Sequence, residues 1–468
     1  LCFARHAAAP AARPPHPPCT PMTELTRALG LPFEPLLFRE RRERFLARAS
    51  AGVALLPAAP ELHRSRDTEI EYRPDSDLAY LTGCLEPQAL ALLTPHDPAH
   101  RFTLFVRPRD PERELWNGAR PGVEGAKALF QADAVYPIAE LAERLPALLE
   151  PADRILYALG ADARLDARVI DMIAHFRRAR QRSGHGPTAV EDPGVMLGEM
   201  RVVKDAAEIG ALRHAAAISA AGQRAALATV RPGVGEWEVE AALEAAFRAA
   251  SARGPAFASI VASGPNATVL HYTANDRVTR PGELLLLDAG AEWGLYCGDL
   301  TRTVPVSGRF SPLQRALYEL VLAAEEAAIA AVRPGAPFSA LHDAALRVLV
   351  AGLVEHHLLQ GEVEALIADG AHKRFCPHQT SHYLGLDVHD VGLYARAGEP
   401  VPLQEGMVLT VEPGLYVPAA AEGVPAEYRG LGIRIEDTVL VTRDGAELLT
   451  RGVPVAPDEV AALVAGEA

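Results

Sequence analysis

The chain has 468 residues, of which 49% are hydrophobic and 23% are charged, so it can bury a substantial core and is not largely disordered. Its net charge of −14 disfavours nucleic acid or an anionic membrane as the main partner. No uncharged apolar run reaches the roughly 18 residues that a membrane span needs. Five cysteines without a CxxC pair fit a reducing compartment, so we expect a cytoplasmic protein.

Residues 1–22 differ from the rest of the chain, because they contain six prolines and no acidic residue. The prolines oppose an amphipathic helix, and the apolar core of a secretory signal is missing. We therefore expect a disordered tail or a translation artefact, with an organellar transit peptide as the alternative.

Residues 23–195 alternate strand-like and helix-like patterns, which favours a smaller α/β amino-terminal domain. The predicted elements are a helix at 36–50, strands at 52–56, 89–94 and 102–106, and helices around 139–150 and 163–180. A stretch with Gly, Pro and polar residues, 181–194, is predicted to be the linker that ends this domain. The second domain, residues 196–468, is predicted to open with an Ala- and Leu-rich helix at 202–229.

The second domain contains an internal repeat. Residues 225–244 and 327–346 each combine a helix end, a Val-Arg-Pro-Gly turn and the start of another helix. Chance is one explanation, because Pro-Gly turns between helices are common. However, histidines and then acid-bearing strands follow each copy, which favours duplicated units related by a pseudo-twofold axis. Such units would bring the acids of both halves to one cleft.

The first pair of acids lies on a predicted hairpin formed by strands at 283–289 and 295–306. If Trp293 and Gly294 form its turn, Asp288 and Asp299 face each other with Cβ atoms about 5 Å apart. Two opposed carboxylates are unfavourable unless a cation offsets their repulsion. The alternative is that one aspartate caps a turn and the other is solvated.

The second pair of acids, Glu412 and Glu436, lies in two alternating runs that read as half-buried strands, 406–417 and 432–442. Strand alternation places Glu436 on the same face as Arg434 and disfavours the neighbouring Asp437 as a ligand. Each glutamate alone would be interpreted as a surface or salt-bridged residue. Beside the aspartate pair, both become candidate metal ligands.

Histidines supply a further candidate ligand. His372, His378, His382 and His389 lie close together in the sequence, and His271 stands apart from them. His372 is predicted to be structural, but the spacing alone does not select the ligand among the others. Four carboxylates and one imidazole suit two ions such as Mn²⁺, Co²⁺ or Fe²⁺. Two such ions can bridge a water and yield a hydroxide nucleophile, which predicts metal-assisted hydrolysis.

Several segments that carry these residues resemble the pita-bread metallopeptidases, and within them the aminopeptidase P (Xaa-Pro aminopeptidase) family. The catalytic-domain segments are HYTAN, LLLDAGAEWGLYCGDLTRTVPVSGRFSPLQ, HQTSHYLGLDVHDVG, GMVLTVEPGLY and YRGLGIRIEDTVLVT. RSRDTEIEYRPDSDLAYLTG and RELWNG resemble the family's amino-terminal domain. Gln379-Thr380 departs from relatives that have glycine after the first histidine of this loop, which bears on substrate preference.

The resemblance implies hydrolysis of the peptide bond between residue one and a proline at position two. It implies that two divalent ions, with Mn²⁺ expected, are bound by Asp288, Asp299, His382, Glu412 and Glu436. It assigns catalytic or substrate-contacting roles to His271, His378, His389 and Glu412, with Glu412 as proton shuttle and His389 as stabiliser of the oxyanion. Tyr416 and Arg434 match residues that line the proline pocket. Trp116 matches a tryptophan that reaches a neighbouring subunit's site, which implies a homo-oligomer (dimer or tetramer), although core burial is the alternative for this residue.

Four other functions compete with this prediction. Prolidase, a dipeptidase for Xaa-Pro, shares the fold and the ligand set. Methionine aminopeptidases share the ligands but usually lack the long amino-terminal domain. Creatinase-like proteins and non-catalytic peptide- or histone-binding modules keep the fold but generally lose metal ligands, so the intact set disfavours both.

Overall fold

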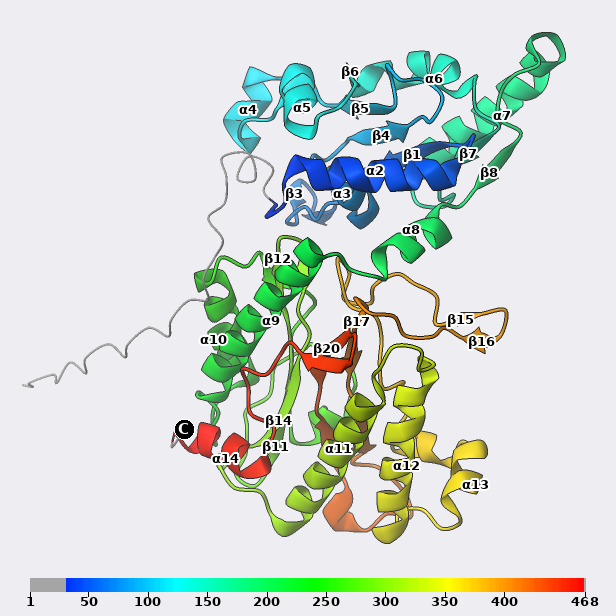
Figure 1. Cartoon of the computed structure of the whole chain (residues 1–468). Coiled ribbons are helices and arrows are strands. Elements are labelled where there is room, and N and C mark those ends of the chain that lie inside the picture. Colours follow the sequence, from blue (N-terminus) through cyan, green and yellow to red (C-terminus); the bar gives the residue numbers. More distant parts are fainter. Residues whose placement is uncertain (1–30, 467–468) are drawn as a thin grey trace, which may run out of the picture.

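The computed structural model describes residues 31–466, with an amino-terminal domain that sits on a larger carboxyl-terminal one (Figure 1). The predicted tail, residues 1–22, lies outside the described residues.

The amino-terminal domain is a six-stranded sheet with helices on both faces. The strand order is β6-β5-β4-β1-β7-β8. The strands are β1 (Val53–Pro57), β4 (Leu90–Leu93), β5 (Phe102–Val106), β6 (Ala134–Pro137), β7 (Arg154–Leu156) and β8 (Ala189–Glu191). Because side chains alternate along a strand, Val53 and Leu55 join one core while Ala54 and Leu56 join the other. One core includes α2 (Pro35–Ala49), α3 (Ser76–Thr82) and α5 (Gly122–Phe130), and the other includes α6 (Leu141–Leu149) and α7 (Ala163–Ser183).

The predicted linker at 181–194 is wrong in part. Its first residues end α7, which is capped by Gly184 in the left-handed conformation, and its middle forms β8, which pairs in parallel with β7. Three residues, Ala189–Glu191, are too short to produce a strand pattern in the sequence. The chain then enters α8 (Gly194–Arg201), which leads to the second domain.

Two pairs of helices flank the strands of the second domain (Figure 1). They are α9 (Ala206–Leu227) with α10 (Glu236–Ala249), and α11 (Pro312–Ala331) with α12 (Ser339–Glu355). The helix predicted at 202–229 starts four residues later, because Asp205 caps it by accepting hydrogen bonds from the N–H groups of Ala207 and Glu208. Val203, just before the cap, pairs instead with Met407.

The strands of this domain repeat one arrangement. In the first half the order is β10 (Ile260–Ser263), β11 (Leu284–Asp288) and β14 (Thr301–Pro305), all antiparallel. In the second half, segment 380–384 pairs with β17 (Val408–Val411), which pairs with β20 (Asp437–Thr442). A bridge between Thr301 and Glu436 joins the two halves. The duplicated helix–helix–strand order is thus present, and superposition of the two halves in an experimental structure tests the twofold axis itself.

Shorter elements complete the fold. They are β2 (His63–Ser65), β3 (Thr68–Glu69), α4 (Pro111–Asn117), β9 (Gly254–Pro255), β12 (Ala291–Trp293), β13 (Tyr296–Cys297), α13 (Val363–Ala368), β15 (Ala395–Arg396), β16 (Glu399–Pro400), β18 (Gly414–Val417), β19 (Leu431–Arg434), β21 (Gly445–Leu448) and α14 (Pro457–Ala465).

The predicted register of the aspartate hairpin is wrong, because the turn lies one residue further along the chain than predicted. Trp293 pairs with Tyr296, so the turn consists of Gly294 and Leu295, whose φ angles are +57° and +69°. Two residues with positive φ match the turn type that suits the twist of a hairpin. In consequence, Asp288 lies opposite Thr301, and Asp299 lies between β13 and β14. The single strand predicted at 295–306 is likewise divided into two.

Candidate active site

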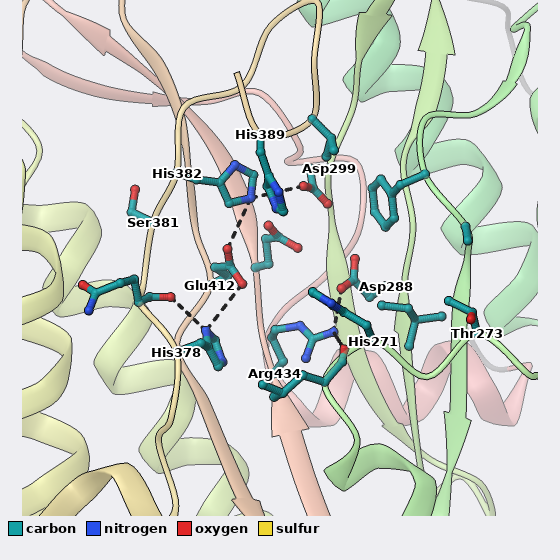
Figure 2. Close-up of a pocket in the computed structure, with 17 residues that line it drawn as sticks. His271, Thr273, Asp288, Asp299, His378, Ser381, His382, His389, Glu412 and Arg434 are labelled. Carbon is teal, nitrogen blue, oxygen red and sulfur yellow. Dashed lines mark hydrogen bonds and ion pairs between the residues drawn. The ribbon is translucent and has the colours of Figure 1, made fainter. Parts of the chain in front are cut away.

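One cavity of about 470 Å³ gathers most of the predicted site residues (Figure 2). All five predicted metal ligands line it, together with three predicted histidines and an arginine. They are Asp288, Asp299, His382, Glu412, Glu436, His271, His378, His389 and Arg434. Two carboxylates therefore come from each half of the duplicated domain.

Strand ends place the four acids. Asp288 ends β11, and Glu412 directly follows β17, the corresponding strand of the second half. Asp299 precedes β14, and Glu436 lies in the short break between β19 and β20. Because the Thr301–Glu436 bridge holds these ends together, the acids meet where the two halves of the sheet join. The long alternating runs of the sequence are interrupted at Glu412 and Glu436.

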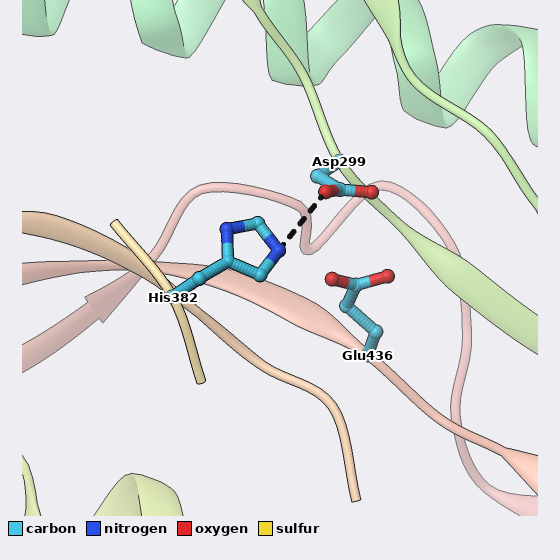
Figure 3. Close-up of side chains that lie close together, drawn as sticks. All are labelled: Asp299, His382 and Glu436. Carbon is cyan, nitrogen blue, oxygen red and sulfur yellow. Dashed lines mark ion pairs between the residues drawn. The ribbon is translucent and has the colours of Figure 1, made fainter. Parts of the chain in front are cut away.

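Asp299, His382 and Glu436 form the most compact group, with one potential ligand atom of each within 4.8 Å of the others (Figure 3). The Nε2 atom of His382 lies 3.6 Å from Asp299 Oδ2 and 3.3 Å from Glu412 Oε1. The Nδ1 atom of His382 donates to the carbonyl of Tyr383 at 3.0 Å, which leaves the Nε2 lone pair directed at the acids. Burial lowers the pKa of His382 to about 4, so its ring is a neutral potential ligand.

The carboxylates repel one another in this arrangement. Burial, followed by the charges of Asp288 and Glu412, raises the pKa of Asp299 well above its usual value. Burial, followed by the charges of Asp299 and Asp288, does the same to Glu436. Burial raises the pKa of Glu412 to about 8, although Arg434 opposes the shift.

A divalent cation fits this donor set. Oxygen ligands with one imidazole nitrogen suit Mn²⁺ or a similar ion. The Oδ1 atom of Asp288 is buried and has no hydrogen-bond partner among residues 31–466, which leaves it available as a ligand. Cations would also offset the repulsion that raises the carboxyl pKa values.

Arg434 links the acids to a tyrosine and a histidine. Its Nη2 atom lies 2.6 Å from Asp288 Oδ2, and its Nη1 atom donates to the Tyr416 hydroxyl at 2.9 Å. That hydroxyl lies 2.8 Å from His378 Nε2 and donates to it, since His378 Nδ1 donates to the carbonyl of Gln379. Burial, followed by the charge of Arg434, lowers the pKa of His378 to about 4. Tyr416 thus lies behind His378 and Arg434, and the two residues in front of it line the cavity.

Three other residues lie away from the cavity. Trp116, on α4, does not line it and is 84% exposed, so the alternative of core burial is wrong. His372 is buried in a short 3-10 helix outside the cavity lining. Asp437, the competing acid, pairs with the buried Arg302 at 2.9 Å.

The apolar wall of the cavity was not predicted from the sequence. Phe257, Ile260, Leu270 and Val388 line it beside the acids. Phe257, Leu270 and Val388 lie outside the strands and helices, where apolar residues carry no periodicity that marks them. Leu270 and Val388 directly precede the predicted site residues His271 and His389, and that position was a signal for these two alone.

The same order of domains is found in known proteins. Residues 210–443 match metallopeptidase family M24, and residues 38–157 match the N-terminal domain of aminopeptidase P. This chain belongs to metallopeptidase family M24. The resemblance to its aminopeptidase P members is thereby confirmed.

Relatives and solved structures cover nearly the whole chain. It is 40% identical to the Xaa-Pro aminopeptidase of Escherichia coli strain K12 over 429 residues, which span 91% of this chain and 97% of that one. It is 33% identical over 401 residues to human Xaa-Pro aminopeptidase 3, with 84% and 77% of the two chains covered. The solved structure of Pseudomonas aeruginosa aminopeptidase PepP has a TM-score of 0.90 at 45% identity, covering 93% of this chain and 99% of that one. Within residues 31–466, no helix has the length and apolar character needed to cross a bilayer.

Proposed function

We propose that this chain is an Xaa-Pro aminopeptidase, a metallo-exopeptidase that releases the first residue of peptides whose second residue is proline. The observation that carries this proposal is the convergence of four carboxylates and the neutral His382 in one cavity. The family supports it, since relatives that match over most of the chain are Xaa-Pro aminopeptidases. A solved structure of the Escherichia coli enzyme contains the inhibitor Pro-Leu.

Asp288, Asp299, His382, Glu412 and Glu436 would hold two divalent ions, and we propose Mn²⁺ as the metal. A zinc-substituted form of the Escherichia coli enzyme has been solved, so the fold also accepts another ion. Such ions supply Lewis-acid chemistry that polarises the scissile carbonyl and lowers the pKa of a water. Glu412 lies at the edge of the ligand cluster, between His382 and His378, and we assign it to carry the proton from water to the leaving amine.

Three histidines face the substrate in this proposal. His389 lies beside His382, with ring centroids 4.5 Å apart, where its ring can donate to the oxyanion of the transition state. His271 lines the other side of the cavity, near Asp288 and Arg434 (Figure 2). His378 is neutral, and its hydrogen bond with Tyr416 fixes its ring, so it can line the subsite for the residue that follows the scissile bond.

A proline at the second position suits this subsite. The tertiary amide before proline has no N–H group, whereas another residue would bring a donor beside His378, whose acceptor nitrogen already has a partner, and Arg434, which only donates. The Tyr416 hydroxyl donates to His378 Nε2 and accepts from Arg434, and Arg434 also donates to the Oδ2 atom of Asp288. An unpaired buried donor costs about 1–3 kcal/mol.

We expect Arg-Pro-Pro to be cleaved at its first bond about 10–100-fold more efficiently than Arg-Ala-Ala, because a tenfold ratio corresponds to about 1.4 kcal/mol. The measurement is kcat/KM for both peptides with purified protein in Mn²⁺. Equal values would contradict the proline preference but not the metallopeptidase activity. The dipeptide Arg-Pro separates prolidase from aminopeptidase, since a prolidase would cleave it in preference to the tripeptide.

We propose that Trp116 contributes to the site of a neighbouring copy in a homo-oligomer, a dimer or tetramer. Trp116 and Leu115 are 84% and 82% exposed on α4, so this apolar surface has no partner within the described part of the chain. Trp116→Ala should lower kcat/KM without unfolding the chain, because a side chain that is exposed in the single chain adds little to its core. Light scattering gives the oligomeric state, and a monomer with full activity would contradict this proposal.

The cytoplasmic location stays a prediction, with which the free thiols of Cys84, Cys297 and Cys376 are consistent.

A further inference from the structure

The position of His389 depends on its backbone. Among residues 31–466, no hydrogen bond holds its ring, which packs edge-on against the ring of His382. His382 itself is fixed by backbone pairing with Thr410. The position of His389 therefore depends on other contacts that fix the backbone of the segment 383–390.

The first of these contacts are made by the next residue, Asp390. Its N–H donates to the carbonyl of Tyr383 at 2.9 Å, which closes the loop 383–390. Its carboxylate accepts from Arg201 Nη2 at 2.6 Å and from Lys204 Nζ at 3.0 Å. The side chains of Asp390 and Lys204 are each 1% exposed and that of Arg201 is 2% exposed, so water does not replace these bonds. We call Arg201, Lys204 and Asp390 the loop anchor.

Gly385 lets the loop anchor close. A Cβ atom on this residue would lie 2.1 Å from Asp390 Oδ2 and 3.2 Å from Lys204 Cε. The Asp390 carboxylate thus packs directly on the backbone at Gly385, so a shift of the loop would also displace the ion pairs.

Contacts with the amino-terminal domain extend the anchor. Arg201 also donates to Asp77 at 2.7 Å and to Asp387 at 2.7 Å. Asp387 accepts from the hydroxyl of Ser76 at 2.7 Å, and Arg73 donates to the carbonyl of Leu386. Residues from α3 and the segment before it therefore hold the same loop from the other side.

We propose that the buried ion pairs of Asp390 with Arg201 and Lys204 position His389 for catalysis. The loop anchor acts through His389 and does not touch the substrate, so its residues are positioning residues. This inference rests on the proposed aminopeptidase function and on the role of His389 within it. It also gives the amino-terminal domain a part in catalysis within a single chain, through Ser76, Asp77 and Arg73.

The test uses Asp390→Asn in the full-length, Mn²⁺-loaded protein. We expect kcat for Arg-Pro-Pro to fall about 10–100-fold, as for other residues that orient a functional histidine. KM and bound metal should change little, because the five proposed ligands are retained. The matched control is Glu208→Gln, which alters another buried polar cluster between the domains, where Glu208 lies 3.3 Å from Arg41. Glu208→Gln can lower Tm but should leave kcat near that of the wild type.

A double-mutant cycle with His389→Ala separates positioning from general damage. If Asp390 acts through His389, adding Asp390→Asn to His389→Ala should change kcat no more than about twofold. If the fold-losses in kcat of the two single variants multiply in the double variant, the inference is overturned. It is also overturned if Glu208→Gln loses as much kcat as Asp390→Asn. A silent His389→Ala contradicts the role of His389, and the inference falls with it.

Two further measurements cover the remaining outcomes. If Asp390→Asn does not fold, Asp387→Asn replaces it, because Asp387 is 36% exposed and its loss leaves Arg201 paired with Asp77 and Asp390. We expect Asp387→Asn to lower kcat by less than Asp390→Asn, and to add little to the loss caused by His389→Ala. Independent losses in the double variant would again refute the proposal. Failure of the wild-type protein to cleave any Xaa-Pro peptide would instead refute the proposed function, which the wild-type assay reveals before any variant is compared.

Discussion

Replacing His382 with alanine should remove nearly all hydrolysis of Xaa-Pro peptides. His382 supplies the one nitrogen ligand of the compact group with Asp299 and Glu436, and among residues 31–466 its Nε2 atom lies beside acids alone. Metal ions contribute several kcal/mol to stabilisation of the transition state. A loss of about 4 kcal/mol lowers the rate about a thousandfold, and we expect a reduction in kcat/KM of that order.

His372→Ala is the matched control, since His372 is in the same histidine-rich segment but buried outside the cavity lining. We expect its kcat/KM to stay within about threefold of the wild type, while Tm falls modestly because a buried side chain is removed. Elemental analysis of both variants links activity to bound metal. An active His382→Ala protein, or an inactive His372→Ala protein with normal metal content, would show that the assignment of the histidines is wrong.

The sequence predicted which acids lie at strand ends better than it predicted how the strands that carry them pair. Apolar runs that end in Asp288 and Glu412 predicted strands with acids at their ends, and the structure has both. The register of the hairpin was not predictable from residue counting. Leu295 adopts a positive φ angle in the turn, which a residue without special preference for that conformation does not reveal. The aspartates lie in one cavity even so, because Asp299 leaves the ladder before β14 begins.

The contacts around Arg201, which join distant parts of the chain, were the least predictable part of the site. Arg201 and Asp390 are 189 residues apart, and nothing in local periodicity relates them. Arg201 is the last residue of α8, and a solvated arginine is the ordinary expectation. The structure instead surrounds it with Asp77, Asp387 and Asp390. Burial of this kind depends on how two domains dock, which only the assembled fold determines.

Removal of the metal should inactivate the protein and make its stability fall with pH between about 6.5 and 8. Burial raises the pKa of Glu412 to about 8, whereas its usual value is about 4.5. The folded metal-free protein therefore keeps a proton that the unfolded chain has released, so the free energy of unfolding decreases as pH rises through this range. The lowered pKa values of His378 and His382, about 4, act in the opposite sense, but only below about 6.5. Bound cations compensate the carboxylate charges, so the stability of the metal-loaded protein should change less.

The measurement is Tm of the chelator-treated and the Mn²⁺-loaded protein at pH 6.5, 7.2 and 8, with peptide hydrolysis assayed in parallel. We expect the difference in Tm to widen with pH and hydrolysis to return when Mn²⁺ is added back. In the metal-free state, Glu412→Gln should be more stable than the wild type at pH 8, since the neutral amide avoids the cost of ionising a buried carboxyl beside other acids. The control Glu447→Gln alters an exposed acid that pairs with Arg213 on the surface, and it should leave the pH dependence unchanged. A metal-free wild type that hydrolyses peptides, or whose Tm does not fall between pH 6.5 and 8, would contradict a site built on four opposed carboxylates, because their repulsion is what the metal has to offset.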